Sequence, residues 1–102
     1  MNLKEKEIEQ QLKLENLAIT LKCIIDCERP QFKVRNLANM AKLEGYFFNP
    51  HLRSLRKNGY LTIKKGSVPK YSVKSFEKLK AYYEEIKNRV SKEFVELVLE
   101  EG

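Results

Sequence analysis

The chain has 102 residues, 42% apolar and 33% charged, which is enough apolar content for one small compact domain and excludes wholesale disorder. Its formal net charge is +6, and no run of apolar residues is long enough for a transmembrane helix. The N-terminal residues alternate Lys and Glu without an apolar stretch, which is not typical of a signal peptide and favours a cytoplasmic protein.

The first predicted element is a helix from residue 3 to about residue 28. Apolar residues at spacings of three and four predict its core face: Leu14, Leu17, Leu21, Ile24 and Ile25. A second stripe, made of Leu12, Ile19 and Cys23, lies roughly opposite on the helical wheel. Because a helix that is apolar on two sides needs two partners, we expect this stripe to bury against another subunit. Pro30 is expected to end the helix.

Short elements follow this helix. Residues 31–33 suit a bridge strand, residues 34–41 a short helix, and Gly45 a turn after that helix. The aromatic residues at 46–48 are expected to pack into the core. Asn49 is a favoured N-cap and Pro50 a favoured first helical residue, so a third helix is predicted from residue 50 to about residue 58, ending at Gly59.

A β-hairpin and a long helix complete the chain. Residues 60–64 and 70–74 alternate in polarity and predict two strands joined by a basic turn. Ser75 is placed to cap the last helix, which carries a coiled-coil-like seam of Phe76, Leu79, Tyr83, Ile86 and Val90. Two uses of this seam remain open, because it can pair two chains or fold back on the first helix of the same chain.

Positive charge is concentrated in one part of the sequence. Residues 51–74 contain 7 basic and no acidic side chains, whereas residues 1–50 have a net charge of +1 and residues 75–102 a net charge of −2. An acid-free basic stretch between nearly neutral flanks is typical of a surface that binds a polyanion. The alternative is a solvated lysine-rich face, although a face that serves only solubility usually mixes both signs.

The order of elements, and above all the segment Leu52-Arg53-Ser54-Leu55-Arg56-Lys57-Asn58-Gly59-Tyr60-Leu61, resembles winged-helix regulators of the bacterial, archaeal or archaeal-virus type. The resemblance implies an α+β, mostly helical fold, a winged helix-turn-helix of three helices plus a two-stranded wing with a long C-terminal helix. Residues 1–74 would form the DNA-binding domain with an N-terminal helical extension. Residues 75–102 would form a C-terminal dimerisation helix.

The resemblance also implies a function, namely sequence-specific binding of double-stranded DNA by a homodimer that regulates transcription. It assigns the recognition helix Asn49, His51, Arg53, Ser54, Arg56 and Lys57, and the wing Lys64, Lys65, Ser67 and Lys70. The predicted dimer interface combines both unexplained apolar stripes: Leu12, Ile19, Cys23, Leu79, Tyr83, Ile86 and Val90. The alternatives are a winged-helix module for protein–protein assembly and an accessory protein of DNA replication or packaging.

Other chemistry has little support in the sequence. His51 is the only histidine, so no nucleophile has a histidine base beside it, and no glycine-rich phosphate loop is present. We therefore predict no catalytic residue, no metal site, no cofactor, no small-molecule substrate and no membrane partner. Cys23 and Cys27 are interpreted as buried thiols, with an intersubunit disulfide as the alternative. Tyr60 is the more exposed candidate for stacking on a base.

Overall fold

The computed structural model describes the backbone of residues 3–101 and the side chains of residues 9, 10 and 12–90. The described chain has an α+β fold, mostly helical, with four α-helices, one short 3-10 helix and a small antiparallel sheet. In chain order the elements are α1 (Leu3–Cys27), β1 (Gln31–Phe32), α2 (Val34–Ala41), η1 (Gly45–Phe47), α3 (Asn49–Lys57), β2 (Leu61–Lys64), β3 (Lys70–Val73) and α4 (Phe76–Glu101).

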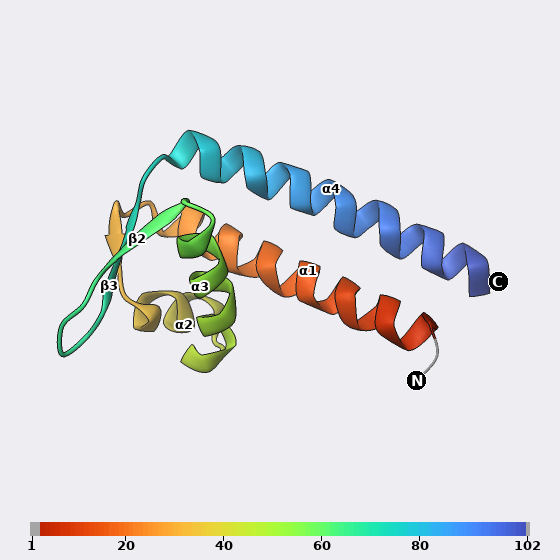
Figure 1. Cartoon of the computed structure of the whole chain (residues 1–102), viewed down its shortest axis with the longest axis horizontal. Helices are drawn as coiled ribbons and strands as arrows, with labels where there is room; N and C mark the ends of the chain where they lie inside the picture. Colours follow the sequence, from red (N-terminus) through yellow and green to blue (C-terminus); the bar gives the residue numbers. More distant parts are fainter. Residues whose placement is uncertain (1–2, 102) are drawn as a thin grey trace.

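The two long helices, α1 and α4, run side by side, and both chain ends lie at the same end of this pair (Figure 1). At its other end, α2 and α3 pack against α1, and the hairpin of β2 and β3 extends outward. None of the helices in the described part of the chain is long and apolar enough to cross a membrane.

Helix α2 has the predicted bounds, but its end differs from the prediction. At its start, the backbone N–H of Lys33 donates a 2.9 Å hydrogen bond to Oδ1 of Asn36. At its end, Lys42 takes the left-handed conformation with φ of 56°, and the N–H of Leu43 donates to the carbonyl of Ala38 at 3.2 Å. Gly45, which was expected to make this turn, instead begins η1.

Helix α3 begins and ends close to the predicted residues, with one correction. Its flanking residue is Phe48 rather than Asn49, and no side chain caps the helix, so the prediction of Asn49 as an N-cap is wrong. Pro50 lies in the first turn, where its missing N–H costs no hydrogen bond. Gly59 has a φ of 86°, which confirms the expected left-handed stop. This stop turns the chain directly into β2.

The sheet has the order β1-β3-β2, with both pairs antiparallel. In the hairpin Leu61 pairs with Val73 and Ile63 with Tyr71, which confirms the predicted pair of strands and shows their register. The ring of Tyr71 stacks on Phe32 at 5.7 Å between centroids. The hairpin is therefore fixed at its base by β1, whereas its tip projects into solvent.

The buried core draws side chains from every element except η1. Its members are Leu21, Ile24, Phe32, Leu37, Phe48, Leu52, Leu55, Leu61, Tyr71, Leu79 and Ile86. The buried hydroxyl of Thr20 donates to the carbonyl of Asn16 at 2.9 Å, so this polar group has a partner. One core therefore holds α3 and the hairpin in place on α1.

The apolar seam of α4 packs within the chain. Leu79 and Ile86 are 0% and 1% exposed and lie in the same core cluster as Leu21 and Ile24 of α1. Both residues were predicted to lie in a dimer interface, and that prediction is wrong because α1 already covers them. The sequence left open whether this seam pairs two chains or packs on the first helix of the same chain, and the structure shows the packing within the chain.

The rest of the predicted dimer interface is divided. Tyr83 and Val90 are half-buried and pack against the same core, as does Cys23. Leu12 and Ile19 are 52% and 40% exposed. Residues 76–90 therefore belong to the same structural unit as the described part of residues 1–74. Within the predicted dimer interface, Leu12 and Ile19 are the large apolar side chains that stay exposed.

Candidate nucleic-acid interface

Helix α3 has one buried face and one solvent face. Leu52 and Leu55 are 0% and 1% exposed and attach the helix to the core. Arg53 and Lys57, four residues apart, point away from the core and are exposed. Arg56 is exposed on one flank of the same face. The predicted solvent stripe of the helix is therefore confirmed.

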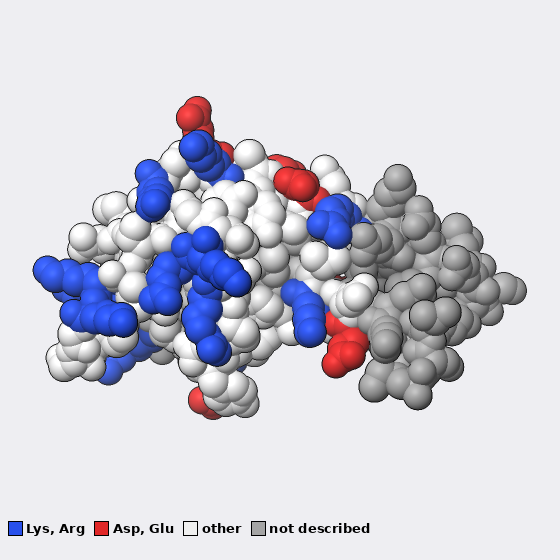
Figure 2. Space-filling model, in the orientation of Figure 1, with Lys and Arg blue, Asp and Glu red and all other residues white. Residues whose placement is uncertain are grey.

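The basic side chains of residues 51–74 gather over α3 and the hairpin (Figure 2). All seven are exposed, namely Arg53, Arg56, Lys57, Lys64, Lys65, Lys70 and Lys74. None of the seven forms an ion pair within the described part of the chain, where Lys22 and Asp26 of α1 are paired at 3.3 Å. Their charge is thus directed to solvent and is not neutralised within the described chain.

The hairpin places two of these cations opposite each other. Lys64 of β2 and Lys70 of β3 are direct partners in the antiparallel register. Like charges in this position destabilise a hairpin, and a bound anion would relieve the repulsion. Lys65 and Ser67 lie exposed in the turn beyond this pair. All four predicted wing residues are therefore accessible at the projecting end of the sheet.

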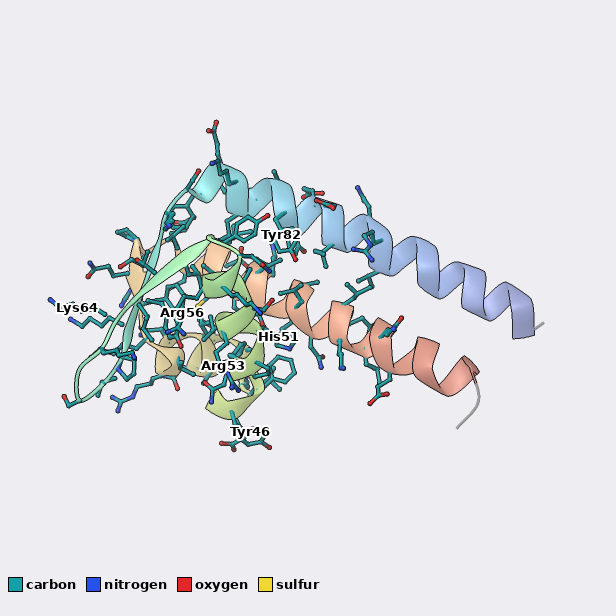
Figure 3. The ribbon with its side chains drawn as sticks, viewed as in Figure 1. Tyr46, His51, Arg53, Arg56, Lys64 and Tyr82 are labelled. Atoms are coloured by element: carbon teal, nitrogen blue, oxygen red, sulfur yellow. The ribbon has the colours of Figure 1, made fainter. Side chains whose placement is uncertain are left out.

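The N-terminal half of α3 differs from the prediction. Asn49 and Ser54 are exposed, but His51 is half-buried and its ring lies 6.0 Å from that of Phe47. Burial lowers the pKa of His51 from its ordinary value of 6.5. Figure 3 shows His51 between α3 and α1, whereas Arg53, Arg56 and Lys64 lie on the outer side. His51 is thus turned away from the basic surface to which it was assigned.

Two aromatic residues also have surroundings that the sequence did not predict. Tyr46, expected in the core, is 75% exposed at the N-terminal end of α3 (Figure 3). Tyr60, expected to be free for base stacking, stacks on Tyr82 of α4 at 4.6 Å with an angle of 6° between the rings. Burial is the main cause that raises the pKa of Tyr82. Tyr46 is therefore the more accessible aromatic ring beside α3.

The structure adds a second group of cations that sequence reasoning missed. Arg29, Lys33 and Lys70 line a small hollow of about 190 Å³ together with Asn36. Arg29 and Lys33 lie outside the acid-free segment, and Asp26 and Glu28 precede Arg29 closely in the sequence. The antiparallel pairing of β1 with β3 brings them to Lys70. No spacing in the sequence signals this group.

The two cysteines offer no metal centre in the described structure. Cys23 and Cys27 are free, half-buried thiols one helical turn apart. Burial, and then the nearby charges of Asp26 and Cys27, raise the pKa of Cys23, which disfavours its thiolate form. Among the described residues, no three or more His, Cys, Asp and Glu side chains gather in a group that would hold a metal ion.

Comparison with known proteins adds no assignment, since no known family model and no curated protein matches this chain.

Proposed function

We propose that the protein is a winged-helix protein that binds double-stranded DNA, with α3 in the major groove and the hairpin as its wing. The observation that carries the proposal is the set of seven exposed, unneutralised cations on α3, the hairpin and the end of β3. An α-helix with its side chains is about 10–12 Å across, which suits a major groove about 12 Å wide.

The two parts of this surface have different tasks. Arg53 lies at the centre of the outer face of α3 and carries a planar donor fork that matches guanine. Lys64, Lys65 and Lys70 carry point charges at the hairpin tip, which suits phosphates rather than base edges. The Arg29, Lys33 and Lys70 hollow extends the phosphate contacts from the hairpin to the residues on either side of β1.

The first test is the salt dependence of duplex binding, measured by fluorescence anisotropy with the full chain. If five of the seven cations reach phosphates, the log–log slope is about −4.5, and affinity falls about 500-fold between 50 and 200 mM salt. Lys65→Ala should reduce the slope by about one, whereas Lys80→Ala, a matched change on α4, should leave it unchanged. Salt-independent binding, or none at low salt, would refute the proposal.

The second test separates sequence-specific binding from general affinity, by selection of duplexes from a random pool. We expect enrichment of a motif, and Arg53→Ala should cost about 1–3 kcal/mol on the enriched site while random DNA binds nearly as before. If Arg53→Ala weakens both equally, the arginine holds a phosphate. Absence of enrichment would favour a replication or packaging role over regulation.

The proposal includes a homodimer, because one recognition helix reads few base pairs and a two-fold pair gains specificity. The surface left for a second chain is smaller than the sequence suggested. Ile19 lines a shallow hollow with Leu43 and Tyr83, on α1, the end of α2 and α4. Dimeric binding predicts an enriched motif with two half-sites about 34 Å apart, and light scattering of the free chain measures the dimer directly.

A further inference from the structure

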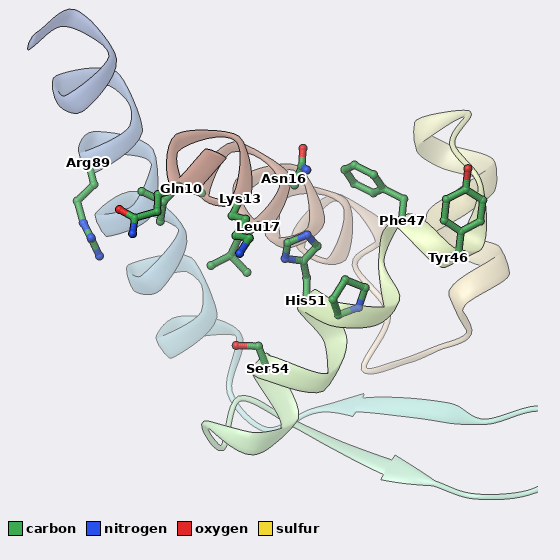
Figure 4. Close-up of a pocket in the computed structure, with 11 residues that line it drawn as sticks. Gln10, Lys13, Asn16, Leu17, Tyr46, Phe47, His51, Ser54 and Arg89 are labelled. Atoms are coloured by element: carbon green, nitrogen blue, oxygen red, sulfur yellow. The ribbon is translucent and has the colours of Figure 1, made fainter. Parts of the chain in front are cut away.

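A groove lies beside α3, on the flank that faces α1 and α4 (Figure 4). It has a volume of about 810 Å³. Its apolar lining comes from Leu14 and Leu17 of α1, from Phe47 at the end of η1 and from Pro50 in the first turn of α3. Pockets of this size that are mostly apolar, with a few polar groups, are typical of sites for small organic molecules.

The positively charged side chains of the groove lie at one end, and the histidine lies toward the other. Lys13 of α1 and Arg89 of α4 line the end where these helices face each other, and His51 and Phe47 lie toward the other end (Figure 4). None of the described lining residues is acidic. Because burial lowers the pKa of His51, its ring is neutral at pH 7 and offers one donor and one acceptor.

We propose that this groove binds a small amphipathic organic anion, with its apolar body on Leu17 and Phe47 and its carboxylate or sulfonate toward the exposed ammonium group of Lys13. The apolar lining selects against inorganic anions, which have no surface to bury there. The positive charge of Lys13 selects against neutral molecules of the same shape. Because each class of lining residue contributes separately, each can be tested separately.

A ligand in the groove would also change the affinity for DNA, an inference that rests on the proposed function. His51 and Ser54 line the groove from the same helix whose outer face carries Arg53 and Lys57. A ligand in the groove therefore contacts α3 on its flank and changes the free energy of the position that α3 takes. By linkage, duplex DNA must change the affinity for the ligand by the same factor.

The probe is 1-anilinonaphthalene-8-sulfonate, an aromatic sulfonate, titrated into the full chain without DNA and followed by fluorescence and leucine and isoleucine methyl NMR. We expect saturable binding that shifts the methyl signals of Leu14 and Leu17 and leaves those of Ile19 and Leu43 in place. N-phenyl-1-naphthylamine, which has the same rings without the sulfonate, should bind more weakly. Equal affinity for both probes would refute the anion requirement.

Two charge reversals complete the test. Lys13→Glu should weaken binding of the sulfonate about fivefold, and Lys80→Glu, an equal change outside the groove, should leave it within twofold. Methyl shifts at Ile19 and Leu43 instead, or equal effects of both variants, would each overturn the proposal.

A duplex titration then separates the two proposals. If the sulfonate binds as expected and no duplex binds at low salt, the DNA-binding function fails and the groove assignment stands. If duplex binds and the sulfonate does not, the groove proposal fails alone. If both bind, the duplex affinity with and without saturating sulfonate must differ, because an unchanged affinity refutes the coupling through α3.

Discussion

The packing of α4 on α1 predicts a large loss of stability for Ile86→Ala. Ile86 is 1% exposed and lies in the core cluster with Leu79 and Leu21, so the change removes three buried carbons and leaves a cavity. Such truncations cost about 2–5 kcal/mol, which is a large fraction of the total for a domain of this size. We expect about 3 kcal/mol, which corresponds to a fall of at least about 10 °C in Tm.

Urea unfolding followed by circular dichroism, at two protein concentrations tenfold apart, measures this effect. The loss should be the same at both concentrations, because the contact is within one chain. Leu12→Ala is the control, since its side chain is 52% exposed and its removal should change stability by no more than about 0.5 kcal/mol. A loss below about 1 kcal/mol, or one that varies with protein concentration, would show that the seam does not pack within the chain.

Three further predictions use other parts of the chain. Gly59→Ala should cost about 1–2 kcal/mol in urea unfolding, because φ is 86° and no atom lies within 4 Å to add a clash, whereas Gly66→Ala should be nearly neutral. His51 has a lowered pKa in the folded chain, so its contribution to stability is complete above about pH 6.5 and is lost as the pH falls through the lowered value. His51→Asn should remove that part of the stability–pH curve, and an NMR titration of the ring gives the pKa directly. Ile19→Glu should give a folded monomer if the homodimer uses the exposed face of α1, and light scattering that shows no change would remove that face from the proposal.

The parts of the fold that the sequence predicted are those set by neighbouring residues. Alternation with a period of two placed Leu61 and Ile63 on one face of their strand, and Tyr71 and Val73 on one face of theirs, and these residues are paired in the hairpin. Gly59 was predictable because few other residues tolerate a positive φ. Ser75 accepts a 3.3 Å hydrogen bond from the N–H of Lys78, as a cap at that position requires.

The wrong predictions concern the packing of α4 and the end of α2, which contacts outside the local sequence pattern decide. The stripe of Leu79 and Ile86 needs an apolar face opposite it, and its spacing is the same whether that face is α1 or a second chain. At the end of α2, Lys42 rather than Gly45 takes the left-handed position, at a cost of about 1–2 kcal/mol that the closing hydrogen bond to Ala38 offsets. Neither outcome is encoded in a local pattern.

The sequence predicted the part of the candidate site that lies in one continuous segment and missed the parts that folding brings together. The seven cations of residues 51–74 were found because they are consecutive in an acid-free segment. Arg29 and Lys33 were missed because sheet pairing brings them to Lys70. The groove was missed because its lining combines α1, the start of α3 and α4, which lie far apart in the sequence.

Helix α3 contributes to both surfaces, since Arg53 and Lys57 lie on the basic surface and His51 and Ser54 line the groove. With nine residues and two leucines buried in the core, α3 would shift as a whole if a ligand displaced it. A ligand that displaces α3 at His51 would therefore also move Arg53 relative to Lys64 on the hairpin. In the proposed complex with DNA, the register of phosphate and base contacts would depend on that spacing. An anion in the groove would thus alter sequence discrimination more than the salt slope, because the number of neutralised phosphates changes less than the alignment of Arg53 with a base edge.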